Sequence, residues 1–165
     1  MNIQQKEKGF TIIEVVLVLA IAGLIFMMVF IALPALQRSQ RDTQRKGDLS
    51  RLDTALSSYQ SNNRGALPSG SVAPTNSTSW FSFLGRYVTT AGDTFVDPSG
   101  TPYVLKNMTN TDPTPTIPNF NAANPNIYVT TGASCNGESL TLGQGPRKVA
   151  FQMKLEGNGV TCVNN

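Results

Sequence analysis

The sequence predicts an α+β fold in which a long N-terminal α-helix, hydrophobic in its first half, packs by its second half against a small antiparallel β-sheet. Three features of the 165-residue chain predict this fold. Residues 15–37 carry no charge, and residues 49–59 place apolar side chains at helical spacing. Residues 66–165 contain short apolar segments separated by Ser, Thr, Asn, Gly and Pro.

The uncharged run from Val15 to Gln37 is long enough to cross a membrane. Its 23 residues correspond to about 34 Å of helix, and the hydrocarbon core of a bilayer is about 30 Å thick. A cleaved secretory signal has a shorter apolar region, of about 7–15 residues, and ends in a small-residue cleavage site. No such site follows Leu36. A simple membrane anchor is consistent with the length alone.

The helix is expected to continue beyond the apolar run. Leu49, Leu52, Leu56 and Tyr59 recur at i, i+3, i+7 and i+10, so they lie on one face of a helix. No strong stop signal comes before the Asn-Asn-Arg-Gly sequence at residues 62–65. We therefore expect one helix over residues 10–62, weakened locally by a proline and a glycine but not ended by them.

Residues 66–165 predict one short helix and about four strands. The apolar spacing over 80–88 indicates a two-turn helix, with Ser77, Thr78 or Ser79 as its cap. The clearest strand covers 149–155, and a Gly-Asn-Gly turn then leads into a second strand at 160–163. Shorter strands are expected at 103–105 and 127–129. A turn precedes the first of them at 97–100, and the four-proline segment 107–126 reads as an exposed loop.

The charge distribution argues against a nucleic-acid-binding domain. Residues 1–65 hold eight basic and five acidic residues, whereas residues 66–165 hold five of each. The basic excess therefore lies outside the part expected to form a globular head. Four basic residues, Arg38, Arg41, Arg45 and Lys46, follow the apolar run, and they are interpreted as a solvated basic face or as partners for acidic residues of neighbouring copies.

The two cysteines, Cys135 and Cys162, both follow the apolar run. A pair placed after a membrane segment is best interpreted as one disulfide formed outside the cytoplasm. Closing a loop of this length stabilises a protein by about 3 kcal/mol on the chain-entropy estimate. More basic residues follow the run than precede it, so the positive-inside rule, counted literally, favours a cytoplasmic C-terminus. The rule is a bias, and the cysteine pair, together with the N-terminal residues described next, outweighs it.

The N-terminus resembles the processing site of type IV prepilins. A short polar leader, MNIQQKEKG, ends at Gly9, Phe10 follows it, and Glu14 is the fifth residue counted from Phe10. A Gly-Phe pair alone is uninformative, but the whole arrangement in front of an apolar helix is specific. The resemblance implies that a prepilin peptidase cuts between Gly9 and Phe10 on the cytoplasmic side and methylates the new amine of Phe10.

The resemblance also implies a role for Glu14 in subunit assembly. A carboxylate inside an apolar layer costs about 2.5–3.5 kcal/mol and so needs a partner. In the family the partner is thought to be the N-terminal amine of an adjacent subunit, here that of Phe10. The alternative is a glutamate that lies at the membrane edge with its carboxylate in water. In filaments of the family the helix is often melted near such residues as Pro34 and Gly23, which allows the filament to extend.

These features together predict a structural subunit with four segments. They are a leader (1–9), a hydrophobic transmembrane and filament-core helix (10–37), its amphipathic continuation (38–65) and a globular pilin head with a C-terminal disulfide region (66–165). Nothing in the sequence indicates an enzyme, a cofactor or a metal site. Asp93 and Asp97 faintly resemble the calcium loop of type II secretion pseudopilins, but two carboxylates are few for calcium, and an ordinary turn is favoured.

We therefore interpret the chain as a type IV pilin. It would be a single-pass protein of the cytoplasmic membrane before assembly and part of an extracellular filament afterwards. The filament would serve twitching motility, adhesion or DNA uptake. The expected partners are other copies of the chain, the prepilin peptidase and methyltransferase, and the pilus assembly machinery; host-cell surfaces and nucleic acid stay open. The alternatives are a pseudopilin of a type II secretion or competence system and an uncleaved, membrane-anchored extracellular binding module.

Overall fold

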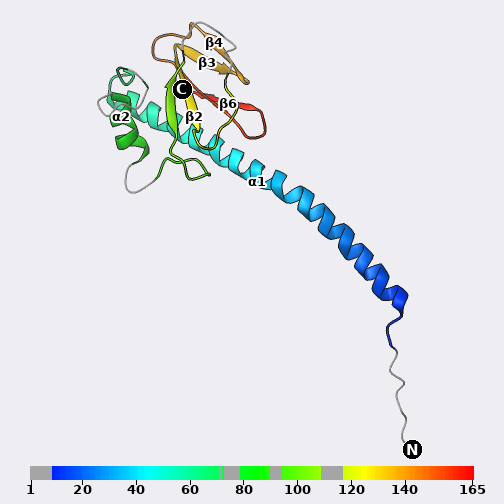
Figure 1. Ribbon diagram of the computed structural model, residues 1–165. Helices are drawn as coiled ribbons and strands as arrows, with labels where there is room; N and C mark the ends of the chain where they lie inside the picture. Colours follow the sequence, from blue (N-terminus) through cyan, green and yellow to red (C-terminus); the bar gives the residue numbers. More distant parts are fainter. Residues whose placement is uncertain (1–8, 71, 73–78, 90–93, 109–116) are drawn as a thin grey trace, which may run out of the picture. The chain divides into compact units, whose positions relative to one another are not determined.

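The α+β fold is confirmed in a computed structural model that describes residues 9–70, 72, 79–89, 94–108 and 117–165. The chain divides into two compact units, residues 1–38 and 39–165. One helix, α1 (Ile12–Asn62), contributes to both units, and six strands and a short helical segment belong to the second (Figure 1). The second half of α1 and the β-sheet therefore form one folding unit.

Helix α1 has 51 residues and includes Pro34. It begins two residues later than expected and ends at the predicted stop. Arg64 adopts a left-handed φ of 56°, and the backbone N–H of Gly65 donates to the carbonyl of Gln60 at 2.7 Å. This six-to-one hydrogen bond satisfies one of the last carbonyls of the helix, as in a Schellman motif, although an arginine here takes the position that glycine usually fills.

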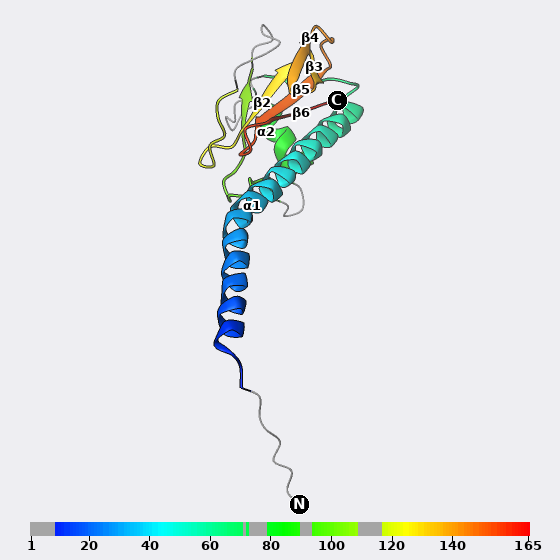
Figure 2. The ribbon, with the colours of Figure 1, turned by 90° about the vertical axis from the view of Figure 1, so that its right-hand side faces the viewer.

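The predicted apolar face of α1 forms the centre of the second unit. Leu49, Leu52 and Leu56 are completely buried, and they pack in one cluster with Val129 and Phe151 of the sheet. Figure 2 shows this part of α1 running alongside the sheet. Burial of each leucine stabilises the unit by about 1.5–3 kcal/mol relative to exposure, so this face is what holds helix and sheet together.

The short helix expected over residues 80–88 is present but changes type halfway. It consists of α2 (Ser79–Phe83) and the π-helical segment η1 (Leu84–Val88). Trp80, Phe83 and Val88 are buried on the face that the apolar spacing predicts. Ser79 is the first helical residue rather than a cap, and the other two candidate caps, Ser77 and Thr78, lie outside the described residues.

The main sheet has four strands in the order β1-β2-β5-β6. They are β1 (Val104–Asn107), β2 (Asn126–Thr131), β5 (Val149–Lys154) and β6 (Val160–Asn164). The β5–β6 hairpin and the β2–β5 pair are antiparallel, as expected. The expectation of a wholly antiparallel sheet is wrong for β1 and β2, which are parallel, because the long connection between them returns the chain to the same end of the sheet.

A second, two-stranded sheet was not predicted from the sequence. It pairs β3 (Ala133–Asn136) with β4 (Ser139–Leu142) through a tight turn at Gly137, whose φ is 62°. Asn136 pairs with Ser139, so the two loop residues are Gly137 and Glu138. Glycine at the first loop position adopts the positive φ of a Gly-X hairpin turn without a steric penalty. Ala133 and Leu140 pack against Ala150 of β5, so the hairpin covers the face of the main sheet opposite α1.

Candidate functional site

The residues of the expected processing site lie immediately before α1. Gly9, Phe10 and Thr11 are not helical, and the Phe10 side chain is 89% exposed. A Cβ added at Gly9 would meet no atom of the described residues within 4 Å. Packing against the described part of the chain therefore does not require glycine at this position. The leader residues 1–8 lie outside the described part of the chain.

Glu14 closes a capping box at the start of α1. Its Oε2 atom accepts hydrogen bonds from the Thr11 backbone N–H at 3.0 Å and from the Thr11 hydroxyl at 2.7 Å. The Glu14 N–H in turn lies 3.4 Å from the Thr11 hydroxyl oxygen. This reciprocal pattern satisfies the Thr11 N–H, which the helix start would otherwise leave without a partner, and the Glu14 N–H also donates to the Thr11 carbonyl at 3.1 Å. Both bonds to the carboxylate fall on one oxygen, and within the described residues Oε1 accepts none.

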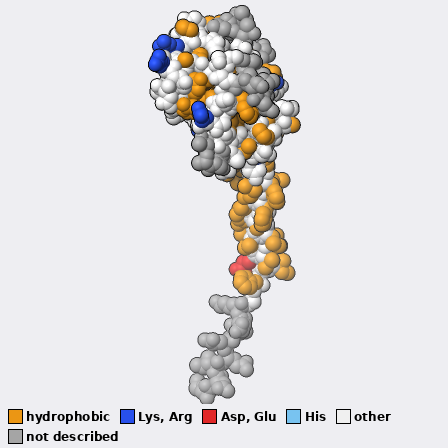
Figure 3. Space-filling model, turned by 90° about the vertical axis from the view of Figure 1, so that its left-hand side faces the viewer, with side chains coloured by type: hydrophobic (Ala, Val, Ile, Leu, Met, Phe, Trp, Pro, Cys, Tyr) orange, Lys and Arg blue, Asp and Glu red, His pale blue; other side chains and the backbone are white. Residues whose placement is uncertain are grey.

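The helix that follows Glu14 presents apolar side chains without protein cover. Within α1 a stretch near the N-terminus is long and apolar enough to cross a membrane, and none of it is buried by the rest of the described chain. In Figure 3 hydrophobic side chains cover the visible face of this stretch, with one acidic group near its start. A helix that is hydrophobic all round needs lipid or other apolar helices around it.

Gly23 and Pro34 both lie inside α1, which the structure describes as one continuous helix. A Cβ added at Gly23 would meet nothing within 4 Å, so the glycine is not required by packing within the chain. Pro34 lacks the N–H that would bond to the carbonyl four residues earlier. Local melting at these two residues in a filament stays a prediction.

A buried arginine organises the start of the second unit. Arg45 is fully buried, and its guanidinium donates to both carboxylate oxygens of Asp97, at 2.5 and 2.9 Å. It also donates to Asp42 at 2.9 Å and to Glu156 at 3.0 Å. The ring of Phe120 lies 4.0 Å from its central carbon. These contacts join α1 to a turn 52 residues away and to the β5–β6 turn 111 residues away.

The same cluster contains a second arginine and two backbone donors. Arg41 forms a bidentate pair with Glu156, at 3.1 and 2.7 Å. The backbone N–H groups of Glu156 and Gly157 each donate to Asp42 at 3.0 Å. Every charge in the cluster therefore makes at least two hydrogen bonds, which is the condition under which buried ion pairs are tolerated.

The cluster shifts the pKa values of its acids downwards. Hydrogen bonds from Arg41 and, secondarily, Arg45 outweigh partial burial and lower the pKa of Glu156. Burial alone would raise the pKa of Asp97, but hydrogen bonds from Arg45 and Ser99 together with the positive charge of Arg45 lower it. Burial also disfavours the charged form of Arg45, yet its three carboxylate partners raise the pKa of the guanidinium above its ordinary value.

The interpretation of the basic residues after the apolar run is wrong for two of the four. Arg41 and Arg45 pair with acids of their own chain, and Arg45 is buried rather than solvated. Asp42 forms an ion pair with Arg45 and accepts hydrogen bonds from the β5–β6 turn of its own chain. Asp48 accepts a hydrogen bond from the Tyr103 hydroxyl at 2.8 Å. These side chains therefore form ion pairs and hydrogen bonds within the second unit.

The turn at residues 97–100 is built by hydrogen bonds within the chain. The Ser99 N–H donates to the Asp97 carboxylate at 2.9 Å, and the Gly100 N–H donates to the Asp97 carbonyl at 2.7 Å. Arg45 engages both carboxylate oxygens from the other side. The ordinary turn favoured from the sequence is therefore what the chain forms at Asp97, and Asp93 lies outside the described residues.

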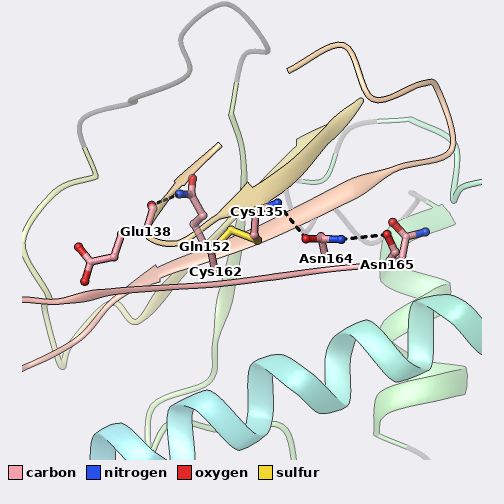
Figure 4. Close-up of a disulfide and its surroundings, with 6 residues drawn as sticks. All are labelled: Cys135, Glu138, Gln152, Cys162, Asn164 and Asn165. Carbon is pink, nitrogen blue, oxygen red and sulfur yellow. Dashed lines mark hydrogen bonds between the residues drawn. A yellow bond between two sulfur atoms is a disulfide. The ribbon is translucent and has the colours of Figure 1, made fainter. Parts of the chain in front are cut away.

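Cys135 and Cys162 form a disulfide, with their Cα atoms 5.7 Å apart. The bond joins the middle of β3 to the middle of β6 (Figure 4). The Cys135 N–H also donates to the Asn164 side chain at 2.8 Å, and Gln152 of β5 donates to the carbonyl of Glu138 in the β3–β4 turn at 2.8 Å. One covalent bond and two hydrogen bonds thus fasten the small hairpin to the main sheet.

Two site features were available in the sequence as short-range patterns, and one was not. The Thr11-x-x-Glu14 spacing matches the capping-box pattern, and Gly137-Glu138 matches the Gly-X pattern of a two-residue hairpin loop. Two of the three acidic partners of Arg45, Asp97 and Glu156, lie 52 and 111 residues further along the chain, so no local pattern points to them.

The N-terminal part of the chain matches a known protein-family model. Residues 4–30 match the family model described as the prokaryotic N-terminal methylation motif. The match covers the junction at Gly9 and Phe10, the capping box and the first part of the apolar helix. No curated protein and no solved structure matches the chain.

Proposed function

Because residues 4–30 carry the prokaryotic N-terminal methylation motif, the signature of type IV prepilins, we propose that this chain is a type IV pilin. It is a structural subunit that is cut after Gly9, methylated at Phe10 and polymerised through its N-terminal helix into a surface filament. One observation carries this proposal. The motif is joined to an exposed apolar helix whose only charged residue between Phe10 and Gln37 is Glu14.

Processing by a prepilin peptidase is supported by the geometry of the junction. Gly9 and Phe10 precede the first helical residue, so their backbone is free to lie extended in a protease cleft. Open space around the Cα of Gly9 implies that glycine is there for an outside partner rather than for the fold. Cleavage leaves a positively charged amine on Phe10, four positions before the Glu14 carboxylate.

Assembly is proposed to pair that amine with Glu14 of a neighbouring copy. The Glu14 carboxylate uses Oε2 for its own capping box, which leaves Oε1 to accept from the incoming amine. In a layer of low dielectric constant the attraction between two opposite charges is much stronger than in water. The exposed apolar side chains behind Glu14 would be covered by lipid before assembly and by other copies afterwards.

The pseudopilin alternative gains no support from the Asp97 turn. Its carboxylate is engaged on both oxygens by Arg45, so the turn does not resemble a vacant cation site. The anchored binding module also accounts for the apolar helix, but it does not account for the match over the cleavage junction. Motility, adhesion and DNA uptake are separate outcomes for the filament, and deletion phenotypes distinguish them.

Replacing Gly9 tests the proposal. Gly9→Val should leave full-length precursor in the membrane and abolish filaments, because a branched side chain blocks the peptidase cleft. Gly47→Val is a matched control, since an added Cβ at Gly47 also meets nothing within 4 Å, and it should retain processing and filaments. Immunoblots of membrane and sheared surface fractions provide the readout. Normal filament yield from Gly9→Val would overturn the peptidase-dependent assembly.

A further inference from the structure

A polar cavity lies in the second unit where the end of α1 meets α2 and η1. It has a volume of about 370 Å³, and Tyr59, Asn62, Asn63, Ser82, Phe83 and Tyr87 are among the residues that line it. Pockets that bind small ligands generally measure about 300–1,000 Å³. Figures 1 and 2 both place α2 beside this end of α1. None of these residues belongs to the N-terminal site or to the Arg45 cluster.

Three of the residues that line the cavity are aromatic, and their rings are in mutual contact. The ring centres of Tyr59 and Phe83 are 5.6 Å apart, those of Tyr59 and Tyr87 are 5.5 Å apart, and those of Phe83 and Tyr87 are 5.9 Å apart. Phe83 is 1% exposed, whereas the two tyrosines are half-buried. The buried phenylalanine therefore fixes two tyrosine rings that are still accessible from the cavity.

The walls carry uncharged hydrogen-bonding groups. The Asn62 amide donates to the Tyr87 hydroxyl at 3.2 Å, which fixes the amide and leaves its carbonyl oxygen with no hydrogen bond within the described residues. The hydroxyls of Ser79 and Ser82, which also line the cavity, make none within that part of the chain. The Asn63 amide is held by a 2.8 Å hydrogen bond to the Tyr59 carbonyl. Such groups both donate and accept hydrogen bonds.

The residues that line the cavity exclude several classes of ligand. Among the described residues no carboxylate lines the cavity, so this lining is not suited to a metal ion or an organic cation. Arg86 is the one charged side chain among the described lining residues, and because it is engaged in another interaction it provides no basis for an anion site. A purely apolar ligand would bury the amides and hydroxyls without partners, which costs free energy.

We propose that this cavity is a carbohydrate-binding subsite that takes one neutral sugar ring. A sugar ring has an apolar C–H face that packs on an aromatic ring and a perimeter of hydroxyls that pair with amides and serine hydroxyls. Tyr59 and Tyr87 provide aromatic rings for the C–H face of the sugar. Asn62, Ser79 and Ser82 provide hydrogen-bonding groups for its hydroxyls. The proposal does not rest on the proposed filament function, because the subsite is complete within one subunit.

Saturation-transfer NMR of the full chain in detergent micelles tests the subsite. The probes are the methyl glycosides of glucose, galactose, mannose and N-acetylglucosamine. At least one should bind, with signal strongest at its C–H face. Ser82→Leu, which fills the cavity from an exposed position, should weaken binding about tenfold or more, the loss expected for about 1.4 kcal/mol of contact. Ser57→Leu, at an exposed serine of α1 outside the cavity, is the matched control and should bind like the wild type.

Amide chemical shifts provide the second readout and guard against misfolding. The bound sugar should shift resonances of residues 59–63 and 79–87 and leave those of the sheet unchanged, and both variants should keep the wild-type sheet resonances. Absence of binding by every probe at millimolar concentration would overturn the proposal. Equal binding by Ser82→Leu and Ser57→Leu, equal loss in both, or shifts confined to other residues would overturn it as well.

Discussion

The Glu14 carboxylate accepts two hydrogen bonds from Thr11, one from the backbone N–H at 3.0 Å and one from the hydroxyl at 2.7 Å. The glutamate therefore has a structural role in each separate chain, as the third helical residue of a capping box. That role is distinct from the proposed pairing with the amine of a neighbour. An alanine substitution removes both roles together, so an assembly defect in Glu14→Ala cannot be assigned to either.

Glu14→Gln separates the two roles. Glutamine serves equally well in a capping box but carries no charge. We expect Glu14→Gln and Glu14→Ala to insert in the membrane and be processed, yet both to lose filaments, because the neighbouring amine would be buried unpaired at a cost of about 3–5 kcal/mol. Filament counts and mature monomer in the membrane fraction are the measurements. Wild-type filament numbers from Glu14→Gln alone would assign the role of Glu14 to capping.

Arg45 should be one of the largest single contributors to the stability of the second unit. Arg45→Met removes the guanidinium that three carboxylates share and leaves Asp97 buried without a counter-charge. The expected loss is about 3–5 kcal/mol of unfolding free energy, measured by urea denaturation. Lys46→Met, at the exposed neighbouring position, should cost less than about 0.5 kcal/mol. Equal losses in the two variants would show that the cluster contributes nothing beyond helix propensity.

The stability of the second unit should fall in acid because of the same cluster. The pKa values of Glu156 and Asp97 are lower in the folded protein than their ordinary values of 4.5 and 3.8. The unfolded chain therefore binds more protons, so stability is fully present above these ordinary values and is lost as pH falls through the lower folded values. Asp53 opposes this trend, because burial raises its pKa despite the positive charge of Lys148.

The acid dependence is measured by urea unfolding between neutral pH and pH about 2, the range in which carboxylates titrate. Glu156→Gln should make the loss of stability in acid less steep, because it removes one of the two carboxyl groups whose pKa is lowered by folding. Asp53→Asn should steepen the decline and raise stability at neutral pH, since it removes a carboxylate that is costly to ionise. A wild-type stability that rises on acidification would contradict the pairing of Arg45 with these acids.

The disulfide should stabilise the second unit by about 3 kcal/mol on the chain-entropy estimate. The variant Cys135→Ser with Cys162→Ser should unfold at correspondingly lower urea concentration, and the amides of β3 and β4 should exchange faster with deuterium. The Leu49 face should keep its protection until global unfolding, because it packs on the other side of the sheet. Unchanged exchange in the hairpin would show that hydrogen bonds alone hold it.

Patterns of short range in the sequence predicted most of the fold. The leucines at positions 49, 52 and 56 and the alternating strand at 149–155 face the core because burial imposes the period of each element. The hairpin at residues 133–142 was not predicted, because its strands are short and partly polar and the glycine of its turn, Gly137, is a weak signal by itself. The parallel pairing of β1 with β2 depends on the route of a long connection, which composition does not specify.

The N-terminal site could be predicted from the sequence because its residues, Gly9 to Glu14, lie within six consecutive positions. The Arg45 cluster was not, since its acids come from three segments that only folding brings together. The sequence around a basic residue after an apolar run does not show whether its side chain is solvated or buried. Arg45 is buried because Asp97 and Glu156, far along the chain, pair with it.

The intact mass of the protein recovered from sheared surface filaments tests the central claim most directly. If the chain is a processed and polymerised subunit, the mass corresponds to a chain that begins at Phe10 and carries one added methyl group, and fragmentation places the methyl group on the Phe10 amine. Protein that retains MNIQQKEKG and occurs only in the membrane fraction would contradict the account and identify the chain as an uncleaved anchor.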